Sequence, residues 1–215
     1  MDSRSCSRRL FRGGLLITAV VLGAVSAACA HLGPWQSIGK PPRDIVTLPV
    51  LGSDQVDSRC GPNAMAEILH AYGDAISEPD IAKAIQNDRV DASLSIDLLL
   101  FARSRGFQAD FDAGTLDSLL DTVQSGRPAV LLLNLEPGAP WPMKGKPMWH
   151  YVVAYGFSRS ARQLLVHSGV GPRALPFDKL ESMWKPAGHW MMYFDRALPL
   201  ARAVPREKRN VPALF

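Results

Sequence analysis

The spacing of apolar residues changes once along the chain, at about residue 127, and this change limits the folds available to it. Before it, apolar side chains recur at intervals of three and four residues, which is typical of amphipathic helices. After it, short apolar or β-branched runs are bounded by turns, which is typical of strands. Helices followed by antiparallel strands predict an α+β fold in which an N-terminal helical layer packs on a C-terminal antiparallel sheet.

We expect four helices in the first part of the chain. The first covers about 61–72, because its apolar residues share one face and Pro62 suits a first helical turn. Another begins after its cap Ser77, a third stops at Gly106, and the fourth covers 115–126. The second part contains one helical pattern, FDKLESMW.

The predicted strands are FQADF, PAVLLLNL, HYVVAYGF, QLLVHSG and HWMMYF. The turn SRSAR joins the third and fourth of these as an antiparallel hairpin. If this hairpin folds about Ser160, His150 lies across from roughly residue 170. The hairpin therefore brings residues close to 170 next to the start of the histidine's strand.

The first 30 residues have the organisation of an export signal. Arg4, Arg8, Arg9 and Arg12 precede the apolar run GGLLITAVVLGAVSAACA, which ends in small residues as secretory signals do. The arginine pair also fits a twin-arginine signal, which is an alternative export route. We therefore predict that the chain is exported to the periplasm or cell envelope.

The end of this run, VSAACA, leaves the fate of the N-terminus open. It resembles a bacterial lipobox, whose cysteine, here Cys29, is lipidated and becomes the first mature residue, although Ser26 stands where leucine is usual. Cleavage after Ala30 is one alternative. An uncleaved anchor is another, because the apolar run of about 18 residues just reaches the length of a short membrane span. We favour lipidation, because it explains a cysteine at the cleavage region.

Composition divides the rest of the chain into three parts. Residues 31–49 are rich in Pro and Gly and are predicted to be a tether, with a short extended segment in the apolar run IVTLPVL at its end. Residues 50–195 carry the helix and strand patterns, and residues 196–215 are predicted to be a basic tail. The length of the middle part suits one domain. Much of the net charge of +4 lies at the two ends, with no basic stripe between them, so nucleic-acid binding is not supported.

The mature chain keeps one cysteine. Cys6 leaves with the signal and Cys29 is removed or lipidated, so Cys60 has no partner for an internal disulfide. A lone thiol in an exported protein is either buried and inert or reactive for a purpose. Cys60 stands where a helix begins, and the unpaired N–H groups and dipole of a helix N-terminus favour a thiolate. We therefore predict that Cys60 is a nucleophile.

A nucleophilic cysteine needs a base, and His150 is the candidate because it begins a strand directly after a long irregular loop. The predicted hairpin brings His167 and Ser168 near it. Ser168 can accept a hydrogen bond from the ring, but it carries no charge and stabilises an imidazolium less well. Gln55, five residues before Cys60, can donate a side-chain N–H to an oxyanion beside the backbone N–H of Cys60.

An ordered set of motifs, QVDSRCGPNAMAEILHAYG, SIDLLLFARSRGF, GRPAVLLL, WHYVVAYGF and HSG, resembles the peptidase C39 family of papain-like cysteine peptidases. Its lipoprotein-like branch without transporter domains is the most similar. The resemblance covers about 50–195. It implies a papain-like fold with Cys60 as nucleophile, His150 as general base and acid, and Gln55 at the oxyanion hole.

Two departures from the family pattern bear on catalysis more than on the fold. The family usually carries Asp on the strand after the histidine, where this chain has Ser168, and its glutamine stands six rather than five residues before the cysteine. The sequence has no P-loop, so we do not expect this chain to drive export with ATP.

We expect a cysteine peptidase that acts on a peptide or protein substrate without a metal or cofactor. Two alternatives stay open. The same cysteine and histidine could serve an amidase or a transglutaminase-type acyl transferase. The missing acidic residue also leaves room for a domain with weakened catalysis that acts as a membrane-tethered peptide-binding or assembly module.

Overall fold

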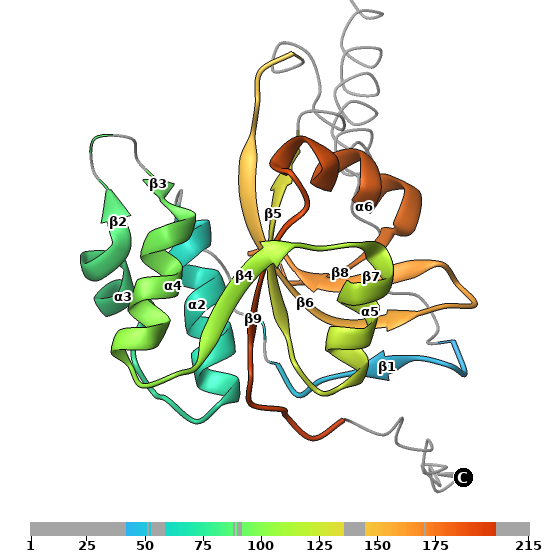
Figure 1. Cartoon of the computed structure of the whole chain (residues 1–215), viewed down its shortest axis with the longest axis horizontal. Coiled ribbons are helices and arrows are strands. Elements are labelled where there is room, and N and C mark those ends of the chain that lie inside the picture. Colours follow the sequence, from blue (N-terminus) through green and yellow to red (C-terminus); the bar gives the residue numbers. More distant parts are fainter. Residues whose placement is uncertain are drawn as a thin grey trace, which may run out of the picture.

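The computed structural model describes residues 42–50, 52, 59–87, 89, 92–135, 145–169 and 171–200. None of the helices in these ranges is long and apolar enough to cross a membrane. On one side of the molecule lie three helices and a short hairpin (Figure 1), which we call the helical lobe. Its elements are α2 (Cys60–Ala71), α3 (Glu78–Ile85), β2 (Gln86–Asn87), β3 (Ala92–Ser93) and α4 (Ser95–Ser104).

The other side, which we call the sheet lobe, is a seven-stranded sheet in the order β4-β9-β5-β6-β7-β8, with β1 paired to the C-terminal end of β6. All its strand pairs are antiparallel. Its elements are β1 (Val46–Thr47), β4 (Ala109–Ala113), α5 (Leu116–Gln124), β5 (Ala129–Asn134), β6 (Trp149–Ser158), β7 (Gln163–His167), β8 (Pro172–Pro176), α6 (Phe177–Trp184), η2 (Lys185–Ala187) and β9 (Trp190–Phe194). Both lobes share one hydrophobic core. The predicted α+β layout is confirmed.

Helix α2 connects the two lobes through its packing. It contacts α3 and α4 on one side and β6 on the other, and every residue from Gly61 to Leu69 is buried. Most of its buried residues are accordingly apolar or small, as the alanines with Met65, Ile68 and Leu69 show. The buried polar residues Asn63 and Glu67 are hydrogen-bonded to each other at 3.1 Å. Pro62 lies in the first turn, where its missing N–H leaves no helical bond unmade. The packing of α2 therefore fixes the position of its first residue, Cys60.

The β6–β7 hairpin has the register expected from the turn at 158–162. Val153 pairs with His167, with a bulge nearer the turn. The end of β7 therefore lies beside the start of β6, where His150 is found. The predicted proximity of His150 to the residues that follow His167 is confirmed.

The sequence pattern does not predict three of the short strands. β1 is not one of them: it lies in the apolar run IVTLPVL, where a short extended segment is expected, and it pairs with β6. β8 begins and ends with proline, a residue that strands accept only at edges and ends, and it is an edge strand of the sheet. β2 and β3 have two residues each, which is too short for a periodic signal. The domain in the structure therefore includes residues before position 50.

Asp44 fastens the chain before β1 to the turn between β6 and β7. Its carboxylate accepts hydrogen bonds from Ser160 Oγ at 2.7 Å, the Ser160 backbone N–H at 2.8 Å and Ser158 Oγ at 2.8 Å. These bonds, with those from Ser160 contributing most, lower the pKa of Asp44 to about 2. The segment that leads toward Cys60 is thereby held on the sheet lobe.

The lowered pKa of Asp44 predicts a pH dependence of stability. An unfolded Asp titrates near 3.9, so this carboxylate stabilises the fold above about pH 4 and the contribution is lost as the pH falls through about 2. We expect the urea midpoint of the wild type to fall more steeply than that of Asp44→Asn between about pH 5 and about pH 2. Asp178→Asn, which removes an exposed carboxylate on α6, should follow the wild type. Parallel curves for Asp44→Asn and the wild type would contradict this role.

Candidate active site

Cys60, the first residue of α2, lies against the start of β6. The backbone N–H groups of Tyr151, Gly61 and Cys60 itself lie near enough to its thiol to lower the thiol pKa. Tyr151 directly follows His150 on β6, and α2 and β6 are in contact. The structure therefore brings together the helix end that carries the predicted nucleophile and the strand end that carries the predicted base.

Gly61 is required by the packing of the β2–β3 hairpin against this helix end. A Cβ atom on Gly61 would lie 2.8 Å from the Cβ of Ser93 and 2.9 Å from its Oγ. Such short distances mean that any larger residue would push β3 away from α2. The glycine after Cys60 thus allows β3 to pack against the start of α2.

Tyr151 joins the two lobes beside Cys60. Its hydroxyl lies 2.9 Å from Ser95 Oγ and donates to the backbone carbonyl of Ser93 at 3.3 Å. Its ring meets that of Trp190 edge to face at 5.8 Å. Burial raises the pKa of Tyr151 to about 12, so the hydroxyl keeps its proton. Sequence reasoning missed this residue, because an aromatic residue after His150 has the pattern of any core strand.

The orientation of His150 comes from the main chain of Ser168. Nε2 of His150 lies 3.0 Å from the Ser168 carbonyl oxygen. A carbonyl can only accept, so Nε2 carries the proton and Nδ1 of the neutral ring is free to take one. Ser168 Oγ is buried and has no hydrogen-bond partner in the part of the chain that the structure describes. The acceptor is thus a carbonyl, where the sequence suggested the hydroxyl.

Burial controls the protonation of the Cys60 thiol and of the His150 ring. It raises the pKa of the Cys60 thiol, although the three backbone N–H groups act in the opposite direction. It lowers the pKa of His150 below its usual 6.5, although the bond to the Ser168 carbonyl opposes this. The sequence-based expectation of a lowered thiol pKa is therefore not met, because desolvation outweighs the helix N-terminus. The free protein holds a neutral thiol and a neutral imidazole near pH 7.

The other predicted residues are not brought into this arrangement. Gln55 lies outside the described residues, so its place at an oxyanion hole stays a prediction. Cys29 also lies outside them, and its lipidation stays a prediction. His167 directs its Nε2 to the carbonyl of Val50 at 3.1 Å, so its ring serves the chain before α2.

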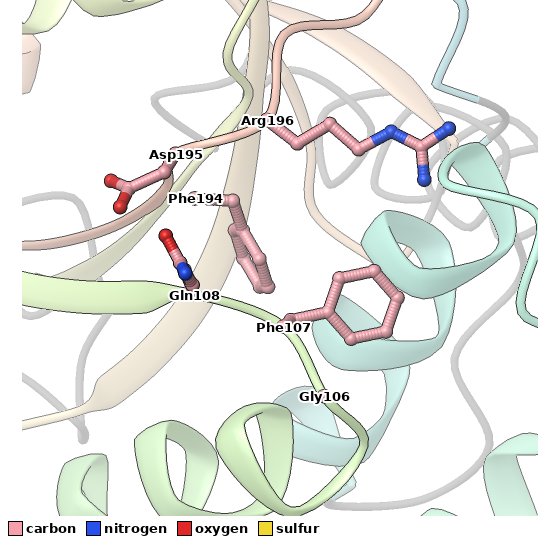
Figure 2. A pocket seen from close by; sticks show the side chains of 6 residues that line it. All are labelled: Gly106, Phe107, Gln108, Phe194, Asp195 and Arg196. Carbon is pink, nitrogen blue, oxygen red and sulfur yellow. The ribbon is translucent and has the colours of Figure 1, made fainter.

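A cavity of about 540 Å³, whose lining residues Figure 2 shows, lies near Tyr72 at the C-terminal end of α2, the end opposite to Cys60. Its lining residues are Gly106, Phe107, Gln108, Phe194, Asp195 and Arg196. Tyr72, which caps α2, packs its ring 5.7 Å from that of Phe107. The 12 residues of α2 place this end about 18 Å from Cys60. Within the described ranges, no group of three His, Cys, Asp or Glu residues is arranged to hold a metal ion.

A cysteine at a helix N-terminus that faces a histidine-bearing strand of an antiparallel sheet defines the class of papain-like cysteine peptidases. The chain belongs to the Peptidase_C39 like family, whose sequence model matches residues 47–191. A comparison with curated proteins found no match. The family assignment establishes a C39-like peptidase domain.

Solved structures share this fold. The peptidase domain of Streptococcus ComA, a bi-functional ABC transporter involved in quorum sensing, aligns with a TM-score of 0.54 and 19% identity over 70% of this chain and 99% of its own. A C39-like peptidase from Bacillus anthracis aligns with a TM-score of 0.56 and 17% identity over 72% and 99%. A double glycine motif protease from an AMS/PCAT transporter, solved in complex with the leader peptide, gives 0.51 and 16% over 74% and 99%. The predicted papain-like fold is confirmed.

The raised pKa of Cys60 predicts how the thiol reacts in the free protein. Alkylation by iodoacetamide requires the thiolate, so we expect its rate to rise with pH and to be half-maximal above 9.0, the ordinary value for the group. Cys60→Ser reports the background from Cys6 and Cys29 in the full chain. Rapid labelling below about pH 6 that is lost in His150→Ala would instead reveal a preformed thiolate–imidazolium pair.

Proposed function

We propose that this protein is a cysteine peptidase that hydrolyses peptide bonds, with Cys60 as nucleophile and His150 as general base and acid. The observation that carries the proposal is the packing of the α2 N-terminus against β6, which brings the backbone N–H of Tyr151, the residue next to His150, near enough to the Cys60 thiol to act on its pKa. It sets the thiol beside the strand end on which the imidazole is oriented by a main-chain carbonyl.

Acylation begins from the neutral pair. Cys60 Sγ attacks the carbonyl carbon of the scissile bond while its proton moves to Nδ1 of His150. The carbonyl oxygen becomes an oxyanion, which the backbone N–H of Cys60 and the side-chain N–H of Gln55 would bind. The imidazolium then returns the proton to the departing amine, and a thioester to Cys60 remains.

Deacylation uses the same two side chains. His150 takes a proton from water, the hydroxide attacks the thioester carbon, and the sulfur leaves as a thiolate that recovers the proton from the imidazolium. In both steps the Ser168 carbonyl keeps the ring in one tautomer. Because the pKa of His150 is lowered, the ring stays neutral and able to act as a base at mildly acidic pH.

Three variants separate the proposed roles. We expect Cys60→Ala to abolish both labelling by a thiol-reactive peptide library and hydrolysis of a fluorogenic one. His150→Ala should lower kcat about 10²–10⁴-fold, which is the usual effect of losing a general base. Ser168→Ala should stay within about threefold of the wild type, because a backbone carbonyl survives any side-chain change. Full activity of Cys60→Ala would end the peptidase proposal, and a large loss in Ser168→Ala would show that its hydroxyl takes part.

Two observations favour a second candidate function. His150 is held by an uncharged carbonyl and the pKa of Cys60 is raised, and both reduce the reactivity of the pair. The domain would then bind peptides or assemble with a partner at the membrane without cleaving them. In the same library assay, binding without product would favour this module, and product formed only with an added amine would favour an acyl transferase.

We also propose that the protein is exported and anchored in the cell envelope by a lipid on Cys29, where it meets its peptide or protein substrate. The basic start, apolar run and VSAACA sequence of residues 1–30 support this. A single lipidated N-terminus would leave the peptidase domain free to move on the tether formed by the residues that follow.

The mass of the mature N-terminus tests the anchor. We expect a diacylated peptide that begins at Cys29, in the membrane fraction of cells that express the full chain. A Cys29→Ser variant should be processed elsewhere or stay uncleaved. An unmodified peptide that begins at His31 in the wild type would indicate ordinary signal cleavage, and an intact residue 1–30 segment would indicate a retained span.

A further inference from the structure

His167 is a buried histidine that the proposed reaction does not use. Its side chain on β7 is only 5% exposed. Its ring stacks on that of Tyr155 on β6, with 4.2 Å between the ring centres and 20° between the planes. A ring held in this way by its neighbours has one fixed orientation, so its nitrogen atoms can act as a rigid attachment point.

The attachment is to the chain that precedes Cys60, which we call the approach segment (Leu48 to Val50, with Gly52). Nε2 of His167 lies 3.1 Å from the Val50 carbonyl oxygen and must donate to it. The Leu48 backbone N–H donates to the Tyr155 carbonyl at 2.7 Å. The approach segment therefore continues the line of β1 along β6, and His167 reaches it from the neighbouring strand.

Gly52 completes the fit. A Cβ atom on Gly52 would lie 2.0 Å from Nδ1 of His167 and 2.5 Å from its Cε1, so the imidazole occupies the space of a side chain. Nδ1 has no hydrogen-bond partner within the described ranges, which agrees with its position against a Cα atom. The segment is thus held by one hydrogen bond and one close contact to the same ring.

The next residue along β7 holds the proposed base. The Ser168 carbonyl accepts the hydrogen bond from His150. Two consecutive residues therefore hold two different partners, since His167 holds the approach segment through its side chain and Ser168 holds the His150 ring through its main chain. This accounts for His167 in the HSG element, a residue that has no role in the proposed mechanism.

We propose that His167 is a positioning residue that fixes the approach segment, from which the chain reaches Cys60 eight residues after Gly52. This role rests on the proposed peptidase function. The approach segment leads to Cys60, whose backbone N–H is a proposed oxyanion donor, so loss of the attachment should weaken binding of the oxyanion, a transition-state interaction, more than binding of the substrate.

The test compares His167→Leu, His167→Gln and Gly52→Ala in the full chain. We measure kcat and KM with a fluorogenic peptide that the wild type hydrolyses, and the rate of Cys60 alkylation by iodoacetamide. We expect His167→Leu to lower kcat about tenfold with KM changed less than about twofold. Alkylation should stay within about twofold, because it needs no oxyanion site. His167→Gln, whose amide N–H can bond Val50, should recover part of kcat, and Gly52→Ala should resemble His167→Leu.

His70→Leu is the matched control for His167→Leu, because it removes another histidine-to-carbonyl contact, to Ile76 at 2.6 Å, on an exposed part of α2. It should keep the wild-type kcat. A wild-type kcat in His167→Leu or in Gly52→Ala would overturn the positioning role and leave the peptidase proposal intact. Equal loss of kcat and alkylation without recovery in His167→Gln would also overturn it. No hydrolysis by the wild type would overturn both.

Discussion

The contact between the N-terminus of α2 and the start of β6 is the interaction on which the rest of the structure depends. There backbone N–H groups from both elements lie near the Cys60 thiol, and Gly61 lets β3 pack against the start of α2. Tyr151 then ties the same point to the helical lobe through Ser95. Because α2 is buried on nearly all sides, its position is set by the whole core. The geometry of the site therefore depends on the packing between the two lobes.

The same burial that fixes the site changes its chemistry. A helix N-terminus alone would favour a thiolate, but enclosing the thiol removes the water that would stabilise the charge. Cys60 and His150 are therefore both neutral in the free protein. When this neutral pair reacts, the thiol proton moves to His150 as the sulfur attacks. The Ser168 carbonyl holds the ring in the tautomer that can accept this proton, and this tautomer matters more for the reaction than a charge on the third residue.

Local signals in the sequence predicted the elements whose contacts are close in the chain. Periodicity and Pro62 located α2, and the turn at 158–162 gave the β6–β7 register. The pairing of β4 with β9 was not predictable, because it joins residues about eighty positions apart and depends on the curvature of the whole sheet. The strand β8 was not predicted because it has a proline at each end, and prolines are typical of loops.

The sequence by itself determined the family, Cys60 as the candidate nucleophile, the histidine that could serve it and the α+β layout. Only the tertiary structure decided how these groups behave. It supplied a backbone carbonyl as the partner of His150, and it attached His167 to the chain before Cys60. It also reversed the expected shift of the thiol pKa. The physical reason is that every residue has a main-chain carbonyl and that burial is set by the whole fold. The sequence therefore does not indicate which side chain will bond to a given carbonyl or which one will be desolvated.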